Sequence, residues 1–406
     1  FDHEYKVPDK MDNLVITSDA DDVNHIHPDY FGKGYRWHDP NLERMEKAYI
    51  EERRFLDEKN VRVRNSTIGG KVQYSYLSSD RSNVIVSERR TVGIVGCGAV
   101  IQKNYLKALA LYPDVRVSNV CDLNSSAAEK VALLTGAKVS SLGQIRSECD
   151  VVIIATPPSS HASLVEEMIA AGRTVICEKP FVGKKSDAEL LVRLASERNC
   201  NLFVAHFRRC FPSVRLARSL IETGVMGAVT GVSASEGGRF SWEAESGYVY
   251  KDPYGGVLFD TGSHTIDMLL HVACLDSSPL EIAVTSVERN CPEPSHDLET
   301  RFTLSGVGTD SIKGHLKFSR LLATANKIRV DCEHGFVELP VGMVNYVKLG
   351  RQGGRSVVVR AKETYDDLMD CFALQFRQML YPDVKRTFTA DKFINLALIL
   401  ETVSQA

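Results

Sequence analysis

Between residues 91 and 205 the chain alternates between short, continuous apolar runs and segments whose apolar residues recur at helical spacing. Continuous runs of this kind predict strands that are buried on both faces, and the spacing between them predicts helices. Such strands alternating with helices form an α/β fold, a doubly wound parallel sheet. The strands are predicted at 91–95, 115–121, 150–155, 174–177 and 201–205, and the helices at 102–111, 125–135, 160–171 and 187–198.

After residue 213 apolar and polar positions alternate one by one, which predicts strands with one buried face and therefore an antiparallel sheet. A helix at 214–222 precedes this region, a helix at 265–274 interrupts it, and helices at 365–380 and 390–401 close the chain. We therefore predict an α+β domain with a large open antiparallel sheet. Its strands are predicted at 228–235, 280–288, 299–305, 311–318, 327–331, 335–339, 344–349 and 356–361.

Residues 1–90 fit neither pattern. Asp39-Pro40 is a typical helix start, and apolar residues at helical spacing follow it as far as Leu56. Short strands are predicted between 61 and 86. We expect this N-terminal extension to form an arm around a neighbouring subunit or a cap over a substrate cleft. The chain thus divides into 1–90, the parallel-sheet domain 91–205 and the α+β domain 206–406.

Composition narrows the class of protein. The 406-residue chain has a formal net charge of -3, which gives no electrostatic case for binding nucleic acid or an anionic membrane surface. No apolar run approaches the roughly 20 residues of a membrane span, and residues 1–10 are too polar for a signal peptide, so we expect a cytoplasmic protein. The ten cysteines include no Cys-x-x-Cys pair, and no metal site is expected.

A glycine turn, Gly96-Cys97-Gly98, follows the first predicted strand and precedes the predicted helix at 102–111; Ala99 and Val100 lie between them and are expected to share the turn's contacts with a cofactor. Glycines here allow a tight turn and a close approach of the backbone to a pyrophosphate, while the helix N-terminus supplies N–H donors. The turn therefore predicts a Rossmann-type dinucleotide-binding domain over 91–205. Ile101 stands where the fingerprint has a third small residue, which predicts looser or shifted packing of the helix on the strand.

Asp122 ends the second predicted strand, 26 positions after Gly96. A carboxylate at this place can accept hydrogen bonds from both hydroxyls of an adenosine ribose, and it would repel a 2′-phosphate. Leu123 and Asn124 offer no cation to neutralise such a phosphate. The sequence therefore favours NAD over NADP. The alternative is that Asp122 only caps the following helix.

Lys179 follows a predicted strand of the parallel sheet and is flanked by Glu178 and Pro180. Ligands of open parallel sheets bind at the carboxyl ends of the strands, so this lysine is predicted to face the nucleotide site. Its ammonium can hydrogen-bond a carbinol oxygen there and stabilise the negative charge that develops during hydride transfer. The alternative is a solvated surface lysine.

A second cluster contains Asp260, His264 and Asp267, at spacings of four and three residues. At a helix start these spacings place side chains on one face. Histidine titrates near neutral pH and can take up a hydroxyl proton, and a nearby aspartate can orient it. The alternative is a capping aspartate and a histidine that is satisfied within the core.

These residues together resemble the glucose–fructose oxidoreductase/inositol dehydrogenase/MocA (Gfo/Idh/MocA) family of NAD(P)-dependent sugar and polyol dehydrogenases over residues 91–406. The resemblance implies the same two-domain fold, and a homodimer or homotetramer formed through the open sheet. The motifs that carry it are the turn at 96–98, Thr156-Pro157-Pro158 with His161, Glu178-Lys179-Pro180, the arginine-bearing segment 206–212, and 255–267.

The resemblance also implies roles for the candidate catalytic and substrate-binding residues. Lys179 would bridge the cofactor and the substrate hydroxyl, and His264 would be the general acid/base. Asp260 would orient His264 or bind the substrate. Arg208 or Arg209 would lie near the substrate, with a solvated or ion-paired arginine as the alternative.

For the cofactor the resemblance implies a second set of contacts. Thr156 and Pro157 would flank the nicotinamide, and Glu178 would lie near its ribose. His161 would belong to the same cofactor site as the glycine turn.

The sequence therefore predicts an NAD-dependent dehydrogenase that oxidises a secondary alcohol of a sugar, inositol or related polyol, or reduces the matching ketone. Two other functions stay open: a redox-neutral enzyme that cleaves glycosides with retained NAD, and a non-catalytic nucleotide-sensing regulator. The presence of Lys179, Asp260 and His264 together argues against a regulator. Loops near 206–212 and 236–256 are expected to select the substrate.

Overall fold

The computed structural model describes residues 89–239 and most of 251–406, and the chain divides into two compact units, Phe1–Val86 and Ser87–Ala406. In the first unit it describes an antiparallel pair, β1 (Leu14–Val15) and β2 (Arg36–Trp37). The helix predicted after Asp39-Pro40 and the strands predicted between 61 and 86 lie outside the described residues. Gly247 is also described, and the residues left out after 251 are 277–281, 292–296, 307–311, 352, 366, 383 and 385.

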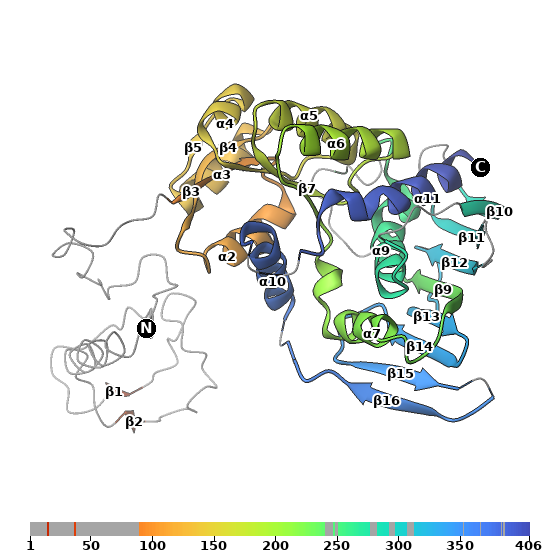
Figure 1. The fold of residues 1–406 in the computed structure, drawn as a ribbon. Coiled ribbons are helices and arrows are strands. Elements are labelled where there is room, and N and C mark those ends of the chain that lie inside the picture. Colours follow the sequence, from red (N-terminus) through yellow and green to blue (C-terminus); the bar gives the residue numbers. More distant parts are fainter. Residues whose placement is uncertain are drawn as a thin grey trace. The chain divides into compact units, whose positions relative to one another are not determined.

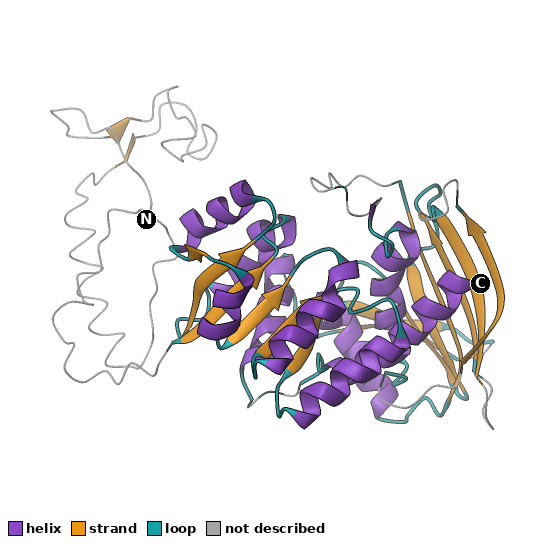
Figure 2. Ribbon diagram, turned by 90° about the horizontal axis from the view of Figure 1, so that it is seen from above, coloured by secondary structure: helices purple, strands orange, loops and turns teal. Residues whose placement is uncertain are grey.

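Six strands form the first sheet, in the order β5-β4-β3-β6-β7-β8 (Figure 1), and every pairing described in it is parallel. Counted along the chain, this order runs 3-2-1-4-5-6, which places the reversal, where ligands bind, between β3 and β6. Helices lie on both faces (Figure 2), which confirms the Rossmann-type prediction. The strands are β3 (Arg90–Val95), β4 (Val115–Cys121), β5 (Lys138–Val139), β6 (Val151–Ile154), β7 (Thr174–Glu178) and β8 (Leu202–Ala205).

The strands of this sheet follow the predicted apolar runs because both faces are covered; all four residues of β6 are buried. Two short elements were not predicted. β5 has two exposed residues and therefore no apolar run, and α4 buries Ile145 alone, so it has no apolar face. α4 does carry a start signal, because Ser141 and Gln144 form a capping box. The helices are α2 (Leu106–Leu109), α3 (Ser125–Thr135), α4 (Leu142–Glu148), α5 (His161–Ala170) and α6 (Lys185–Glu197).

Eight strands form the second sheet, in the order β10-β11-β12-β9-β13-β14-β15-β16. Its pairings are antiparallel except one: β9 and β12 run parallel, so the sheet is mixed. The reason is that β12 and β13, which are consecutive and run in opposite directions, lie on the two sides of β9, so one of them must run parallel to it. The strands are β9 (Val229–Gly237), β10 (Ile282–Asn290), β11 (Glu299–Gly306), β12 (Lys313–Ser319), β13 (Lys327–Cys332), β14 (Gly335–Pro340), β15 (Tyr346–Gly350) and β16 (Ser356–Arg360).

Helices α7 (Pro212–Glu222), α9 (Ser263–Val272) and α11 (Ile394–Gln405) lie on one side of this sheet (Figure 1). Residues on that side, such as Phe302 and Phe318, are buried. Among the described elements no helix covers the other side, which carries more exposed residues such as His315. Strands such as β13 and β14 therefore show the alternation that predicted them, whereas β16 is exposed along most of its length.

The C-terminal helices return to the first sheet. α10 (Leu368–Leu380) packs on α2, and α11 packs on α6 as well as on α9. These contacts join the parallel-sheet part and the mixed-sheet part within the second unit. Among the helices that the structure describes, none is long and apolar enough to cross a membrane.

Arg209 lies inside the second unit, buried in an ion cluster. Its Nη2 lies 2.6 Å from Asp267, its Nη1 lies 3.2 Å from Asp276, and its guanidinium stacks on Phe393. Burial alone would raise the pKa of Asp276, but the hydrogen bond from His271 and the charge of Arg209 hold it well below its usual value. Arg209 is 2% exposed, so the ion-paired alternative holds for this residue.

Because a buried charge that loses its partner is costly, Arg209→Met is expected to lower the free energy of unfolding by about 3–5 kcal/mol in urea denaturation. Arg215→Met is the matched control, since Arg215 pairs with Glu363 at the surface; its cost is expected below about 1 kcal/mol. Equal losses in the two variants would contradict a structural role for the buried cluster.

Candidate active site

The glycine turn has the geometry that a dinucleotide needs. Gly96 has φ of +92°, and a Cβ on it would lie 2.5 Å from the carbonyl oxygen of Ala155, so no larger residue fits. A Cβ on Gly98 would meet nothing within 4 Å, so open space lies in front of the turn. Ala99 and Val100 begin the helix that follows. A pyrophosphate at the helix N-terminus therefore fits the residues present.

Asp122 holds this turn from the end of β4. Its Oδ2 accepts a hydrogen bond from the backbone N–H of Cys97 at 2.6 Å, and its Oδ1 accepts one from the backbone N–H of Asn124 at 2.7 Å. Asn124, not Asp122, is the N-cap of α3. A carboxylate has about four lone-pair positions, so Asp122 keeps acceptor capacity for ribose hydroxyls.

Ile101 changes the helix that follows the turn. The residue is fully buried and begins a π-helical turn, η2 (Ile101–Tyr105), which continues into α2. A π turn holds one residue more than an α turn, and such turns occur often at functional sites. The sequence predicted looser or shifted packing of the helix on the strand at Ile101, and the structure shows a π-helical turn that begins there. The predicted 102–111 helix is therefore part π and part α.

His161 braces the loop that contains Thr156 and Pro157. Its Nε2 lies 2.9 Å from the carbonyl oxygen of Thr156, and its Nδ1 lies 2.9 Å from that of Pro180. Burial lowers the pKa of the imidazole below its usual value. Because the ring is fully buried against these carbonyl groups, it ties the Thr156 loop to the segment that follows Lys179.

Lys179 lies at the carboxyl end of β7 and pairs with Asp260. The same carboxylate also pairs with Arg320. The Nζ of Lys179 is 2.8 Å from Oδ1 of Asp260, and Arg320 Nη2 is 2.8 Å from Oδ2. Burial raises the pKa of Asp260, but Lys179 and Arg320 together bring it below the usual value. One carboxylate therefore joins two cations, one from each sheet.

Sequence reasoning missed Arg320, which directly follows β12. Its side chain is 5% exposed. The sequence signal was weak, because an arginine after a strand of an antiparallel sheet is ordinarily a surface residue. The sequence feature that could have pointed to Arg320 is its position just beyond the end of a predicted strand.

His264 lies in α9, where its ring contacts the rings of neighbouring side chains. The ring of Phe207 lies 5.6 Å and that of His206 5.7 Å from its own ring. Among the described residues no hydrogen bond joins His264 to Asp260, and Asp267 pairs with Arg209. The expected orientation of His264 by an aspartate is therefore absent from the described contacts, and packing takes that role.

The electrostatic surroundings keep His264 neutral. Burial, followed by the positive charges of Lys179 and Arg208, lowers the pKa of His264 well below its usual value. Only the neutral form of an imidazole can accept a proton, and the lowered pKa makes His264 a weaker base than a free histidine. Arg208 itself forms a bidentate pair with Glu236 of β9 at 2.8 and 3.1 Å, which places it in the wall of the site near His264.

Glu178 ends β7 and is fixed by two donors. Its Oε2 accepts a hydrogen bond from the backbone N–H of Lys179 at 3.0 Å, and its Oε1 accepts one from the hydroxyl of Tyr105. Sequence reasoning did not predict a role for Tyr105. A buried tyrosine in an apolar helix pattern gives no sign that its hydroxyl reaches a strand end far along the chain.

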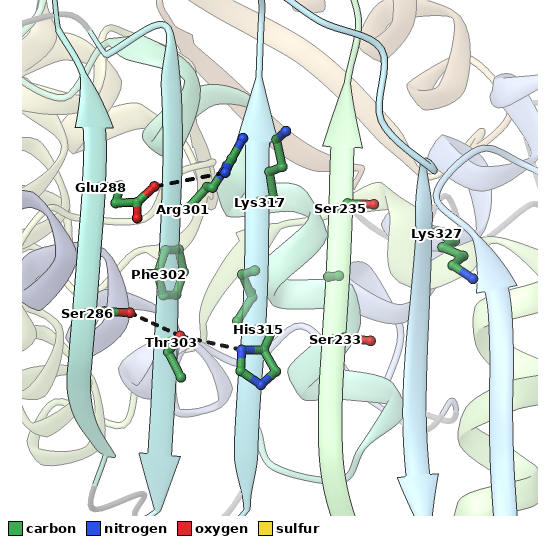
Figure 3. Close-up of a pocket in the computed structure, with 12 residues that line it drawn as sticks. Ser233, Ser235, Ser286, Glu288, Arg301, Phe302, Thr303, His315, Lys317 and Lys327 are labelled. Carbon is green, nitrogen blue, oxygen red and sulfur yellow. Dashed lines mark hydrogen bonds and ion pairs between the residues drawn. The ribbon is translucent and has the colours of Figure 1, made fainter. Parts of the chain in front are cut away.

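The open side of the second sheet carries a pocket of about 400 Å³ (Figure 3), which is separate from the cluster around Lys179. Small polar side chains, such as Ser233, Ser235 and Thr303, lie between the charged groups. Figure 3 shows Arg301 directed toward Glu288. The Nη1 of Arg301 lies 3.9 Å from the Oε2 of Glu288. None of the candidate catalytic residues lines this pocket. Within the part of the chain that the structure describes, no group of three metal-ligating side chains occurs.

Two relatives with known names match part of the chain. Inositol 2-dehydrogenase of Rhizobium meliloti is 29% identical over 196 residues, which cover 48% of this chain and 57% of that protein. The dTDP-3,4-didehydro-2,6-dideoxy-alpha-D-glucose 3-reductase of Streptomyces violaceoruber is 29% identical over 147 residues, which cover 36% of this chain and 43% of that protein. The chain thus spans about half the length of these curated relatives.

Solved structures share the fold over a longer stretch. Aldose-aldose oxidoreductase from Caulobacter crescentus, complexed with glycerol, has a TM-score of 0.65 at 16% identity and covers 78% of this chain and 97% of its own. GenD2 from gentamicin A biosynthesis, in complex with NAD, has a TM-score of 0.63 at 20% identity. The match covers 79% of this chain and 95% of the GenD2 chain. At these identities the likeness concerns the fold alone.

Two family models match the chain in consecutive segments. The model of the oxidoreductase family with an NAD-binding Rossmann fold matches residues 90–206, and the model of the GFO/IDH/MocA C-terminal domain matches residues 214–338. Together they cover more than half of the 406 residues, in the order of the two sheets. The chain therefore belongs to the Gfo/Idh/MocA family of oxidoreductases.

Proposed function

We propose that this protein is an NAD-dependent dehydrogenase that oxidises a secondary alcohol of a sugar, inositol or related polyol, or reduces the matching ketone. The observation that carries the proposal is the Lys179–Asp260–Arg320 cluster at the carboxyl end of the parallel sheet. Open parallel sheets bind their ligands at this end. His264 lies in α9, which directly follows the turn that contains Asp260. The named relatives, an inositol dehydrogenase and a sugar 3-reductase, act on substrates of the same class.

In this proposal Lys179 donates a hydrogen bond to the carbinol oxygen and stabilises the charge that develops on it. Asp260 holds the ammonium of Lys179 in place, and Arg320 holds Asp260. The neutral imidazole of His264 takes up the hydroxyl proton on a ring nitrogen. NAD, held by the glycine turn and Asp122, would supply the acceptor for the hydride of the carbinol carbon.

The same proposal assigns the cofactor contacts. The backbone at Gly96, Gly98, Ala99 and Val100 would hold the pyrophosphate, and Asp122 would accept hydrogen bonds from the adenosine ribose. The loop of Thr156 and Pro157, which His161 braces, would flank the nicotinamide, with Glu178 near its ribose. A negative charge at Asp122 favours NAD over NADP, although solved structures of the same fold include complexes with either cofactor.

The open side of the second sheet, which no described helix covers, supports a further part of the proposal: that the protein forms a homodimer or homotetramer. Short polar side chains at the centre of this side would let a second copy approach closely. Light scattering is expected to give a dimer or tetramer for the wild type and a monomer for Ser235→Arg. Glu166→Arg, on an exposed face of α5, is the control and should keep the wild-type mass. A monomeric wild type would contradict this part.

The activity is tested by NADH formation from NAD with a panel of polyols, sugars and nucleotide sugars. Lys179→Ala is expected to lower kcat on the order of 10²–10³-fold, because one preorganised donor to the developing alkoxide is lost. Lys185→Ala, at an exposed i,i+4 pair with Glu189, is the control and should leave kcat unchanged.

Two outcomes separate the proposal from its competitors. NAD binding with substrate turnover but no net NADH would favour the redox-neutral reaction. NAD binding with no turnover at all, and a cellular output that survives Lys179→Ala, would favour a nucleotide-sensing regulator.

The cofactor preference is tested by Asp122→Asn, which keeps an acceptor for the N–H of Cys97 but removes the charge. The affinity for NADP relative to NAD is expected to rise on the order of tenfold in binding titrations, because the repulsion of the 2′-phosphate is lost. Asn124→Ala is the control: it removes the cap of α3, costing about 1 kcal/mol of stability, and should leave the ratio unchanged. An unchanged ratio in Asp122→Asn would show that Asp122 does not select the cofactor.

A further inference from the structure

Tyr105 has a contact that the proposed chemistry does not use. It is the last residue of η2 and is 1% exposed. Its hydroxyl donates a hydrogen bond to Oε1 of Glu178, while Oε2 of the same carboxylate accepts the backbone N–H of Lys179 at 3.0 Å. The phenol, the carboxylate and the backbone of Lys179 therefore form one continuous chain of hydrogen bonds.

The ring of Tyr105 is also part of a packed row of aromatic side chains. It meets Phe372 edge-on at 5.6 Å and Phe376 at 4.9 Å, both from α10. Phe372 stacks on Phe207 at 4.6 Å, and Phe207 meets His264 edge-on at 5.6 Å. Tyr105 thus contacts Glu178 through its hydroxyl and, through its ring, the row that packs against His264.

The π turn explains how this tyrosine reaches Glu178. The turn runs from Ile101, the residue in the place of the third fingerprint glycine, to Tyr105. Successive residues of an α-helix are rotated by about 100°. Without the extra residue of the π turn, the Tyr105 side chain would leave the helix in a different direction. Ile101 and Tyr105 are therefore two parts of one local arrangement.

The charge of Glu178 depends on this contact. Burial raises the pKa of Glu178 above its usual value, and the hydrogen bond from Tyr105 and the charge of Lys179 act in the opposite direction. Within the described residues Tyr105 from η2 and Lys179 from its own strand end act on the pKa of Glu178, and the charge of Glu178 in turn raises the pKa of Cys177. Burial also raises the pKa of Tyr105, so the phenol stays protonated and remains a donor.

We propose that Tyr105 is a positioning residue of the active site: its hydroxyl keeps Glu178 as a carboxylate, and Glu178 fixes the backbone that presents the Lys179 ammonium. The kinetic consequence rests on the dehydrogenase function proposed above, whereas the effect on Glu178 does not. Loss of the hydroxyl leaves a buried carboxylate with one donor fewer, which favours its protonated form.

The test uses the full chain with Tyr105→Phe, Glu178→Gln and the double variant. The control is Tyr112→Phe, which removes another partly buried hydroxyl, one that donates to the carbonyl oxygen of Ala373 in α10. NMR of protein labelled with ¹³C at the glutamate carboxyl carbons reports the titration of Glu178, whose signal is identified by its absence in Glu178→Gln. This readout needs neither cofactor nor substrate.

In Tyr105→Phe the Glu178 titration is expected to move to higher pH, and in Tyr112→Phe it is expected to stay in place. With a substrate in hand, kcat of Tyr105→Phe should fall about tenfold at neutral pH, with its acidic limb moved to higher pH. Because glutamine does not titrate, removing the hydroxyl should not move the acidic limb further, and the double variant should match Glu178→Gln in its pH profile.

An unmoved Glu178 titration in a folded Tyr105→Phe protein would overturn the proposal, whatever the activity. A moved titration with a kcat and pH profile equal to those of Tyr112→Phe would overturn the positioning role. If no substrate of the wild type is found, the NMR titration still decides the Tyr105–Glu178 contact, and the failure then belongs to the proposed function.

Discussion

The carboxylate of Asp260 is the contact on which the rest of the site depends. It accepts Lys179 from the parallel sheet on one oxygen and Arg320 from the mixed sheet on the other, each at 2.8 Å. All three groups are largely buried, and each charge would be costly without the others. The pairing therefore links the end of β7 to the end of β12 and at the same time holds the ammonium at the carboxyl end of β7.

Two π-helical turns supply the residues around this contact. One, η2, brings Tyr105 to Glu178, and the other, η5 (Leu258–Gly262), contains Asp260. A π turn changes the direction of the side chains that follow it, and it is tolerated where neighbouring packing holds it. α10 supplies such packing for η2, because its phenylalanines lie against Tyr105, and α9 and α11 pack against η5. The C-terminal helices thus support the geometry of a site whose residues come from earlier in the chain.

Most of the fold could be predicted from the sequence, because the apolar patterns are strong wherever a strand is buried on one or both faces. The short exposed strand β5 and the parallel pairing of β9 with β12 could not, since neither leaves a local pattern. In the site, the places of Gly96, Asp122 and Lys179 follow from strand ends. Arg209 in its ion cluster, the contact of Asp260 with Arg320, and the hydroxyl of Tyr105 depend on residues distant in sequence, which no local rule specifies.

The most direct measurement is a single turnover of the NAD-loaded protein with a polyol that carries deuterium on the reacting carbinol carbon. The account predicts that reduced nicotinamide appears, that it carries the deuterium, and that the label slows its formation. Consumption of substrate by the NAD-loaded protein with no labelled reduced nicotinamide would contradict net hydride transfer as the reaction of this site.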